Sequence, residues 1–178
     1  MSTQLIEKQT IYDGKKLRLE VHHLEDDEGN RHHREVVVHP GAVVILPFVD
    51  EQNIVMIRNK RYAVNEVLLE LPAGTLEKGE AAMNCAGREL LEETGYLARR
   101  IKPLYSFYSS PGILSEKMHA FAAYDLQKKS PSLDEGEEIE AEVVPLADAI
   151  GMVRDGLIVD AKTIVVLLQY HCFANRQV

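Results

Sequence analysis

The first half of the chain is dominated by apolar runs of strand length. Residues 9–24 alternate between apolar and polar positions around the turn dipeptide Asp13-Gly14, and a second turn at residues 26–30 leads into another β-branched run. This pattern predicts antiparallel strands joined by hairpins. Three further strand candidates follow, and the first is apolar throughout, which indicates a buried strand: residues 42–49, 53–62 and 67–74.

The apolar spacing changes to a helical period at residues 80–94. Ala82, Ala86 and Leu90 recur at every fourth position, so on a helix they form one stripe that is expected to face the core. Gly95 follows directly and predicts the end of the helix, because glycine readily adopts the left-handed conformation that closes many helices.

The second half begins with two strand candidates, residues 98–110 and 115–126, on either side of Pro111-Gly112. A polar, acidic stretch at residues 128–142 predicts a long loop that leads into a short strand ending near Val144. The chain therefore returns to strands after its central helix and does not alternate strand with helix.

Two helices are expected to close the chain. Residues 145–154 predict a short helix that stops at Gly156, and Asp160 is placed to cap the second one. Strands that surround helices without βαβ alternation predict an α+β or mixed-sheet sandwich. The second helix is expected to be well buried because four of its positions are apolar: Ile164, Val165, Leu167 and Leu168.

Length and composition fit one globular domain with its own core. The 178 residues are 46% hydrophobic and 27% charged, as in ordinary globular proteins. Residues 1–38 are expected to form a separate strand region ahead of a main domain at residues 39–178. The two cysteines, Cys85 and Cys172, are far apart and match no metal-ligand spacing, so Cys85 is expected to be a small packing residue.

The charge pattern excludes some functions. A net charge of −8 argues against a nucleic-acid-binding protein, which normally has a basic face. No apolar run reaches 18 residues, so no segment is expected to span a membrane. The first ten residues lack the charged and apolar regions of a signal peptide, and a cytoplasmic location is therefore expected.

Three carboxylates crowd the predicted central helix. Glu89, Glu92 and Glu93 are three and four residues apart, so they share one side of the helix and repel one another. They also lie in its last turns, where the helix dipole favours cations. A bound divalent cation would compensate both effects, and hard oxygen ligands suit Mg²⁺ or Mn²⁺.

The residues around these carboxylates resemble the Nudix box. Each fixed charged and glycine position of that pattern is filled, over 23 residues, and the one departure is Tyr96 where a small aliphatic residue is commoner. So many matched positions are specific for a short motif. The matched residues are Gly74, Glu80, Arg88, Glu89, Leu90, Glu92, Glu93 and Gly95.

The resemblance implies a Nudix-type α/β/α sandwich with a mixed central sheet and an N-terminal antiparallel extension, and Mg²⁺-dependent hydrolysis of a nucleoside diphosphate linked to another moiety. By this analogy Glu89 and Glu93 are the principal metal ligands, and the carbonyl of Ala73 completes part of the sphere. Glu92 is a ligand or supports the ligands, and Arg88 orients the carboxylates at the catalytic centre.

The flanking sequence resembles one branch of the family. Pro111 and Gly112 lie in an SPG element sixteen residues after the box, which is similar to ADP-ribose pyrophosphatases and related nucleoside-diphosphate-sugar hydrolases. The approach LLELPAGTLEKGE, which contains Glu70, is also similar to that branch. The resemblance therefore implies that Glu70, Pro111 and Gly112 lie at the substrate.

In this branch the N-terminal strands commonly exchange between the subunits of a homodimer. The resemblance thus implies that Arg34 reaches the substrate of the partner subunit, and that Arg61 contacts the diphosphate in its own subunit. No nucleic acid or membrane partner is implied.

The acidic loop before the last strand gains a role from the same resemblance. A glutamate on this mobile loop activates the attacking water or binds a catalytic metal. The loop offers Glu135, Glu137 and Glu138. Alignment by Ile139 favours Glu135, with Glu137 next.

The function implied is Mg²⁺-dependent cleavage of ADP-ribose to AMP and ribose 5-phosphate. A broader nucleoside-diphosphate-sugar pyrophosphatase, acting on GDP-mannose or ADP-glucose, is the main alternative. A sensor that binds a nucleotide sugar without cleaving it is a second alternative, but such proteins generally have broken boxes or an added DNA-binding module.

Overall fold

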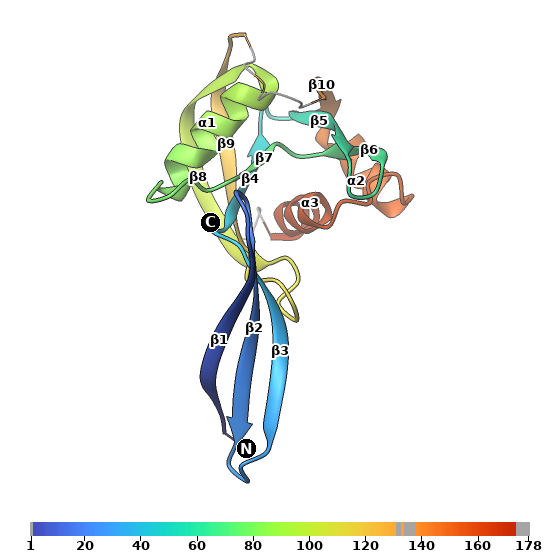
Figure 1. Ribbon diagram of the computed structural model, residues 1–178. Helices are drawn as coiled ribbons and strands as arrows, with labels where there is room; N and C mark the ends of the chain where they lie inside the picture. The colour runs from blue at the N-terminus through green and yellow to red at the C-terminus, as the bar shows by residue number, and fades with distance from the viewer. Residues whose placement is uncertain (1, 131–132, 134–137, 174–178) are drawn as a thin grey trace.

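A three-stranded antiparallel sheet projects from the body of the molecule in the computed structural model, which describes residues 2–130, 133 and 138–173 (Figure 1). The sheet has the order β1-β2-β3, with β1 at Thr3–Asp13, β2 at Arg18–Asp26 and β3 at Arg31–Val38. Its hairpins turn at the two places that the sequence predicts. β1 is exposed along its whole length, so this single chain leaves much of the sheet open to solvent.

The body is built on a mixed four-stranded sheet of order β7-β4-β9-β8. β4 runs parallel to β9, whereas β7 pairs with β4 and β8 with β9 in antiparallel fashion. The strands are β4 (Ala42–Pro47), β7 (Ala73–Thr75), β8 (Tyr96–Tyr108) and β9 (Lys117–Lys128). β4 connects directly to β3, so the projecting sheet leads into the centre of the body.

The body has a second, antiparallel sheet of order β10-β5-β6, which lies beside the four-stranded sheet. It consists of β5 (Asn53–Arg61), β6 (Glu66–Glu70) and β10 (Ile139–Pro145). Three helices complete the fold: α1 (Ala82–Thr94), α2 (Leu146–Arg154) and α3 (Ala161–Phe173). The predicted α+β fold with a mixed sheet is confirmed. None of the described helices has the length and apolar character needed to cross a membrane.

Strand β4 separates two apolar cores. Val43 and Ile45 face a small cluster with α1, while Val44 and Leu46 face a larger one with α2, α3 and the second sheet. All four side chains are fully buried, because alternate residues of a strand point to opposite faces and both faces are covered. The continuous apolar run of the sequence is thus explained by helices on both sides of the sheet.

Helix α1 differs from the prediction only at its start. The sequence predicted a helix from residue 80, but Glu80 precedes α1 because its carboxylate accepts hydrogen bonds from the Glu77 N–H and from Arg88. The predicted stripe packs on the core, with Ala86 and Leu90 fully buried. Cys85 is fully buried beside them, and this burial raises the pKa of its thiol to about 12, so it acts as a packing residue.

Helix α3 is less buried than its apolar sequence predicted. The Asp160 carboxylate caps it by accepting a hydrogen bond from the Thr163 N–H at 3.0 Å, as expected. Val166 and Leu167 are fully buried, but Val165 and Leu168 each keep 38% of their surface exposed. The expectation for these last two was wrong, because α3 packs on the body along one face only.

Candidate active site

Arg88 on α1 neutralises the carboxylates that crowd this helix. Its guanidinium donates to Glu80 at 3.0 Å, to Glu89 at 2.7 Å and to Glu92 at 2.9 Å. The hydrogen bonds from Arg88 are the largest cause of a pKa of about 2 for the Glu80 carboxyl. Arg88 therefore offsets the repulsion between Glu89 and Glu92 that the sequence indicates, and its third partner, Glu80, precedes α1.

Strand β7, which precedes α1, shapes the space around Glu93 and Glu89. Glu93 is buried, and its carboxylate accepts a hydrogen bond from the N–H of Ala73 at 2.9 Å. A Cβ atom built on Gly74 would overlap the carboxyl group of Glu89. The box glycine is thus required because Glu89 lies against the backbone of β7.

Two adjoining cavities meet at these residues. The first has a volume of about 580 Å³ and contains both Glu89 and Glu93, and the second has a volume of about 410 Å³ and contains Glu70. Both are lined by Arg61, Ala73 and Gly74. A ligand that spans the two cavities would therefore cross the carboxylate cluster at Gly74.

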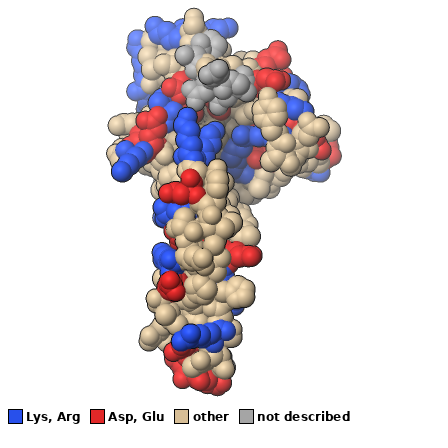
Figure 2. Space-filling view, in the orientation of Figure 1, with Lys and Arg blue, Asp and Glu red and all other residues tan. Residues whose placement is uncertain are grey.

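Basic side chains outnumber acidic ones in the walls of the first cavity. Its walls carry five basic side chains, Lys15, Lys16, Arg61, Lys78 and Arg88, and three acidic ones, Glu77, Glu89 and Glu93. Figure 2 shows Lys and Arg side chains gathered on this face where the projecting sheet joins the body. Arg61 and Arg88 are already paired with carboxylates, so it is mainly the lysines of this wall that favour an anionic ligand.

Arg61 and Lys162 are held at the wall of the second cavity by a buried carboxylate. Glu70 is fully buried and accepts hydrogen bonds from Arg61 Nε at 2.7 Å and from Lys162 Nζ at 2.5 Å. Lys162 also pairs with Asp160 at 3.0 Å. The hydrogen bond to Glu70 raises the pKa of Arg61, so this cation is held both in charge and in position.

The carboxylates fit a metal ion that keeps part of its water shell. In the described part of the chain no three His, Cys, Asp or Glu side chains converge tightly enough to hold a metal by themselves. Glu89 and Glu93 nevertheless line one cavity with Ala73, and Gly74 leaves room beside Glu89. Mg²⁺ usually binds through one or two carboxylates plus substrate phosphates, so this donor set suits it.

Other predicted site residues lie elsewhere in this chain. Arg34 is exposed in β3 and donates to the carbonyl of His33, and it lines neither cavity. Pro111 and Gly112 form a turn that lies outside both cavity walls, whereas Ser109, two residues before Pro111, lines the second cavity.

Of the three candidate loop glutamates, the structure describes only Glu138. Glu135 and Glu137 lie outside the described residues. Glu138 is described, and its carboxylate accepts a hydrogen bond from the hydroxyl of Tyr62 at 3.0 Å.

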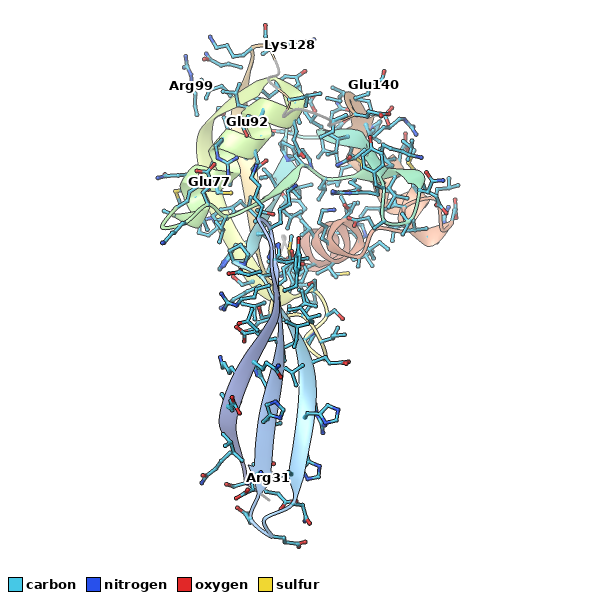
Figure 3. All side chains as sticks on the ribbon, in the orientation of Figure 1. Arg31, Glu77, Glu92, Arg99, Lys128 and Glu140 are labelled. Atoms are coloured by element: carbon cyan, nitrogen blue, oxygen red, sulfur yellow. The ribbon has the colours of Figure 1, made fainter. Side chains whose placement is uncertain are left out.

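Figure 3 shows Glu77 and Glu92 near α1 and Arg31 at the far tip of the projecting sheet.

Sequence reasoning missed four cations that line the cavities: Lys15, Lys16, Lys78 and Lys162. Lys15 and Lys16 come from the β1–β2 turn, and Lys162 comes from the first turn of α3. The β1–β2 turn is closed by the hydrogen bond from Gly14 N–H to Leu17 carbonyl at 3.0 Å. No local pattern distinguishes these lysines from surface lysines, so only the folded chain reveals them.

Comparisons with known proteins give consistent matches. The model of the NUDIX domain matches residues 38–166. The chain is 40% identical over 165 residues to an ADP-ribose pyrophosphatase of Bacillus subtilis (strain 168), which covers 92% of this chain and 89% of that relative. It is 38% identical over 167 residues to a methanol dehydrogenase activator of Bacillus methanolicus, which covers 93% of this chain and 90% of the relative.

A GDP-mannose pyrophosphatase of Cronobacter sakazakii is 36% identical over 152 residues, covering 80% of this chain and 79% of the relative. Among solved structures, an ADP compounds hydrolase superposes with a TM-score of 0.86 at 26% identity, covering 99% of this chain and 96% of that chain.

Proposed function

Because the chain belongs to the NUDIX family, we propose that it hydrolyses the pyrophosphate bond of ADP-ribose to AMP and ribose 5-phosphate with Mg²⁺ as cofactor. The observation that carries this proposal is the placement of Glu89, Glu93 and Ala73 in one cavity whose walls have an excess of cations. A nucleoside diphosphate joined to a sugar has the negative charge that the basic side chains of these walls favour.

The relatives support the choice of substrate class. A similar protein is named for ADP-ribose and another for GDP-mannose. Both molecules contain a nucleoside diphosphate joined to a sugar, so recognition through the diphosphate serves either. ADP-ribose is preferred here because that relative is more similar and matches over more of this chain. GDP-mannose and ADP-glucose are the alternatives.

Glu89, Glu93 and the Ala73 carbonyl would hold the metal, with Glu92 as a further ligand or support. A divalent cation held there would neutralise diphosphate charge and would lower the pKa of a bound water. Arg88 would orient the carboxylates through its three contacts. Activation of the attacking water is assigned to a loop glutamate, Glu135 first and Glu137 next.

The two arginines proposed for the substrate act from different places. Arg61, fixed by Glu70, faces both cavities and would bind the diphosphate. Because Glu70 is fully buried and already accepts from two cations, its role is to position Arg61 and Lys162. A guanidinium held in this way suits phosphate oxygens, which it can bind in bidentate fashion.

A substrate panel tests the proposed function. Purified protein is incubated with Mg²⁺ and, separately, with EDTA, and the products from ADP-ribose, GDP-mannose, ADP-glucose, UDP-glucose and nucleoside triphosphates are separated by chromatography. We expect ADP-ribose to give the highest kcat/KM, AMP as product, and no turnover in EDTA. Higher kcat/KM for GDP-mannose would overturn the substrate choice. No turnover of any compound, with thermal stabilisation by one of them, would favour the sensor alternative.

We further propose that the projecting sheet exchanges between two subunits of a homodimer. Its strand β1 exposes Leu5, Ile6, Ile11 and Tyr12, and a three-stranded sheet without a packed face is marginally stable alone. Pairing with a second copy would cover this apolar surface and carry Arg34 toward the partner's cavities.

Sedimentation equilibrium is expected to give twice the mass of one chain. Arg34→Ala is expected to raise KM for ADP-ribose while the dimer persists, and Arg31→Ala, at the tip of the same sheet, serves as the control. A monomer with full activity would overturn the exchanged arrangement. An Arg34→Ala dimer with unchanged KM would remove Arg34 from the substrate site.

A further inference from the structure

A buried hydrogen bond ties α3 to the segment that enters the carboxylate cluster. The N–H of Leu71 donates to Oγ1 of Thr163 at 2.8 Å, and neither residue has exposed surface. The two residues are 92 positions apart, so the bond forms only when α3 docks on the body. Buried polar side chains generally have such a partner, but the hydroxyl of Thr163 has no part in the reaction described above.

The next two residues carry this contact into the site. The carbonyl of Pro72 accepts a hydrogen bond from the N–H of Ile45 in β4 at 2.9 Å. The N–H of Ala73 then donates to Glu93 on α1 at 2.9 Å. Because Pro72 has no N–H, Leu71 and Ala73 supply the only backbone donors of this three-residue segment. The segment is therefore held by α3, β4 and α1 in turn.

The first turn of α3 is itself firmly placed. Asp160 caps Thr163 through its N–H, and Lys162 donates to Glu70, the residue before Leu71. Two consecutive residues of α3 thus bind two consecutive residues of the entering segment. This double contact fixes both the position and the direction of the chain as it approaches Ala73.

We propose that Thr163 is a positioning residue, whose hydroxyl fixes the segment of residues 71–73 and thereby the Ala73 backbone and the Glu93 carboxylate. Removal of the hydroxyl leaves the buried Leu71 N–H without its acceptor, and the segment must shift to recover one. A misplacement of about 1 Å at a reacting centre can lower turnover by up to about 10²-fold. The expected effect on turnover rests on the proposed function. The hydrogen bonds themselves do not, because they are present in the protein without any ligand.

Three variants separate positioning from general stability. Thr163→Val keeps the shape and removes the hydroxyl, Thr163→Ser restores the hydroxyl, and Val166→Ala removes buried apolar volume from the same helix without altering that bond. Each is measured for Tm, for kcat and KM with ADP-ribose, for Mn²⁺ binding by electron paramagnetic resonance, and for hydrogen exchange at the Leu71 and Ala73 amides.

Thr163→Val is expected to speed exchange at both amides, to weaken Mn²⁺ binding, and to lower kcat about tenfold or more with a smaller change in KM. Thr163→Ser should remain close to the wild type, and Val166→Ala should lower Tm with kcat unchanged. The inference is overturned if Thr163→Val retains wild-type exchange and Mn²⁺ binding, or if Val166→Ala shows the same losses.

The amide exchange and Mn²⁺ measurements do not depend on the substrate. If the wild-type protein turns over no compound of the panel, the proposed function fails while these two readouts still decide the role of Thr163. If turnover is present and these readouts are unchanged in Thr163→Val, only the positioning role fails.

Discussion

Glu93→Gln is expected to lower kcat for ADP-ribose by about 10³-fold while the protein remains folded. Metal ions contribute several kcal/mol of charge stabilisation to transition states of this kind, and each 1.36 kcal/mol corresponds to a factor of ten. Gln has nearly the same shape as Glu, and its side-chain oxygen can still accept the hydrogen bond from Ala73 N–H. The substitution therefore removes the negative charge and leaves the packing in place.

The measurement is steady-state kinetics with Mg²⁺ titration, together with Tm. Glu51→Gln is the control for the same change of residue type. Glu51 is exposed in the turn between β4 and β5 and lines neither cavity, so this variant should retain wild-type kcat. Because Gln keeps the shape of the buried Glu93 side chain and its hydrogen bond with Ala73 N–H, Tm of Glu93→Gln should stay close to that of the wild type. A variant with wild-type kcat would show that Glu93 is not a metal ligand.

Gly74→Ala is expected to lower kcat by about 10²-fold. The added Cβ would coincide with the Glu89 carboxyl group, so this carboxylate must leave its position beside β7 or the β7 backbone must move. Misplacement of a reacting group by about 1 Å costs roughly this factor. Displaced Glu89 would also lose its 2.7 Å contact with Arg88, and this adds to the disturbance of the cluster.

Gly151→Ala in α2 is the control for the change of glycine to alanine. A Cβ there meets its nearest neighbour, the Arg154 guanidinium, at 3.9 Å, an ordinary contact. Alanine also favours the helix, so Tm should rise slightly with kcat unchanged. The explanation from steric overlap is refuted if Gly74→Ala matches the wild type in kcat and in Mg²⁺ requirement.

The carboxylate cluster could be predicted from the sequence because it is local. Glu89, Glu92 and Glu93 are brought together by the period of a single helix, and the penalty of their repulsion is visible in the residue types alone. The same locality let Gly95 predict the helix end, where the structure has a left-handed glycine with φ of 71°. The apolar run that forms β4 was equally clear.

Other features depended on contacts between distant segments. The partial exposure of Val165 and Leu168 was missed because an apolar sequence does not indicate how many faces of a helix will be covered. The start of α1 was placed two residues early because the bond between Glu80 and Arg88 outweighs the helical pattern there.

The sequence by itself determined most of the elements, the mixed α+β architecture and the family, because these depend on periodicity and on residues close together along the chain. The single strand predicted at residues 67–74 was wrong, because this segment leaves one sheet after β6 and joins the other as β7. Only the tertiary structure decided that Lys15 and Lys162 line the cavities, that Glu70 holds two cations, and that Thr163 binds Leu71. These contacts join segments that are far apart in the sequence and meet only in the folded protein. Lysine, glutamate and threonine are common on surfaces and in cores, so their role depends on the neighbours that the fold gives them.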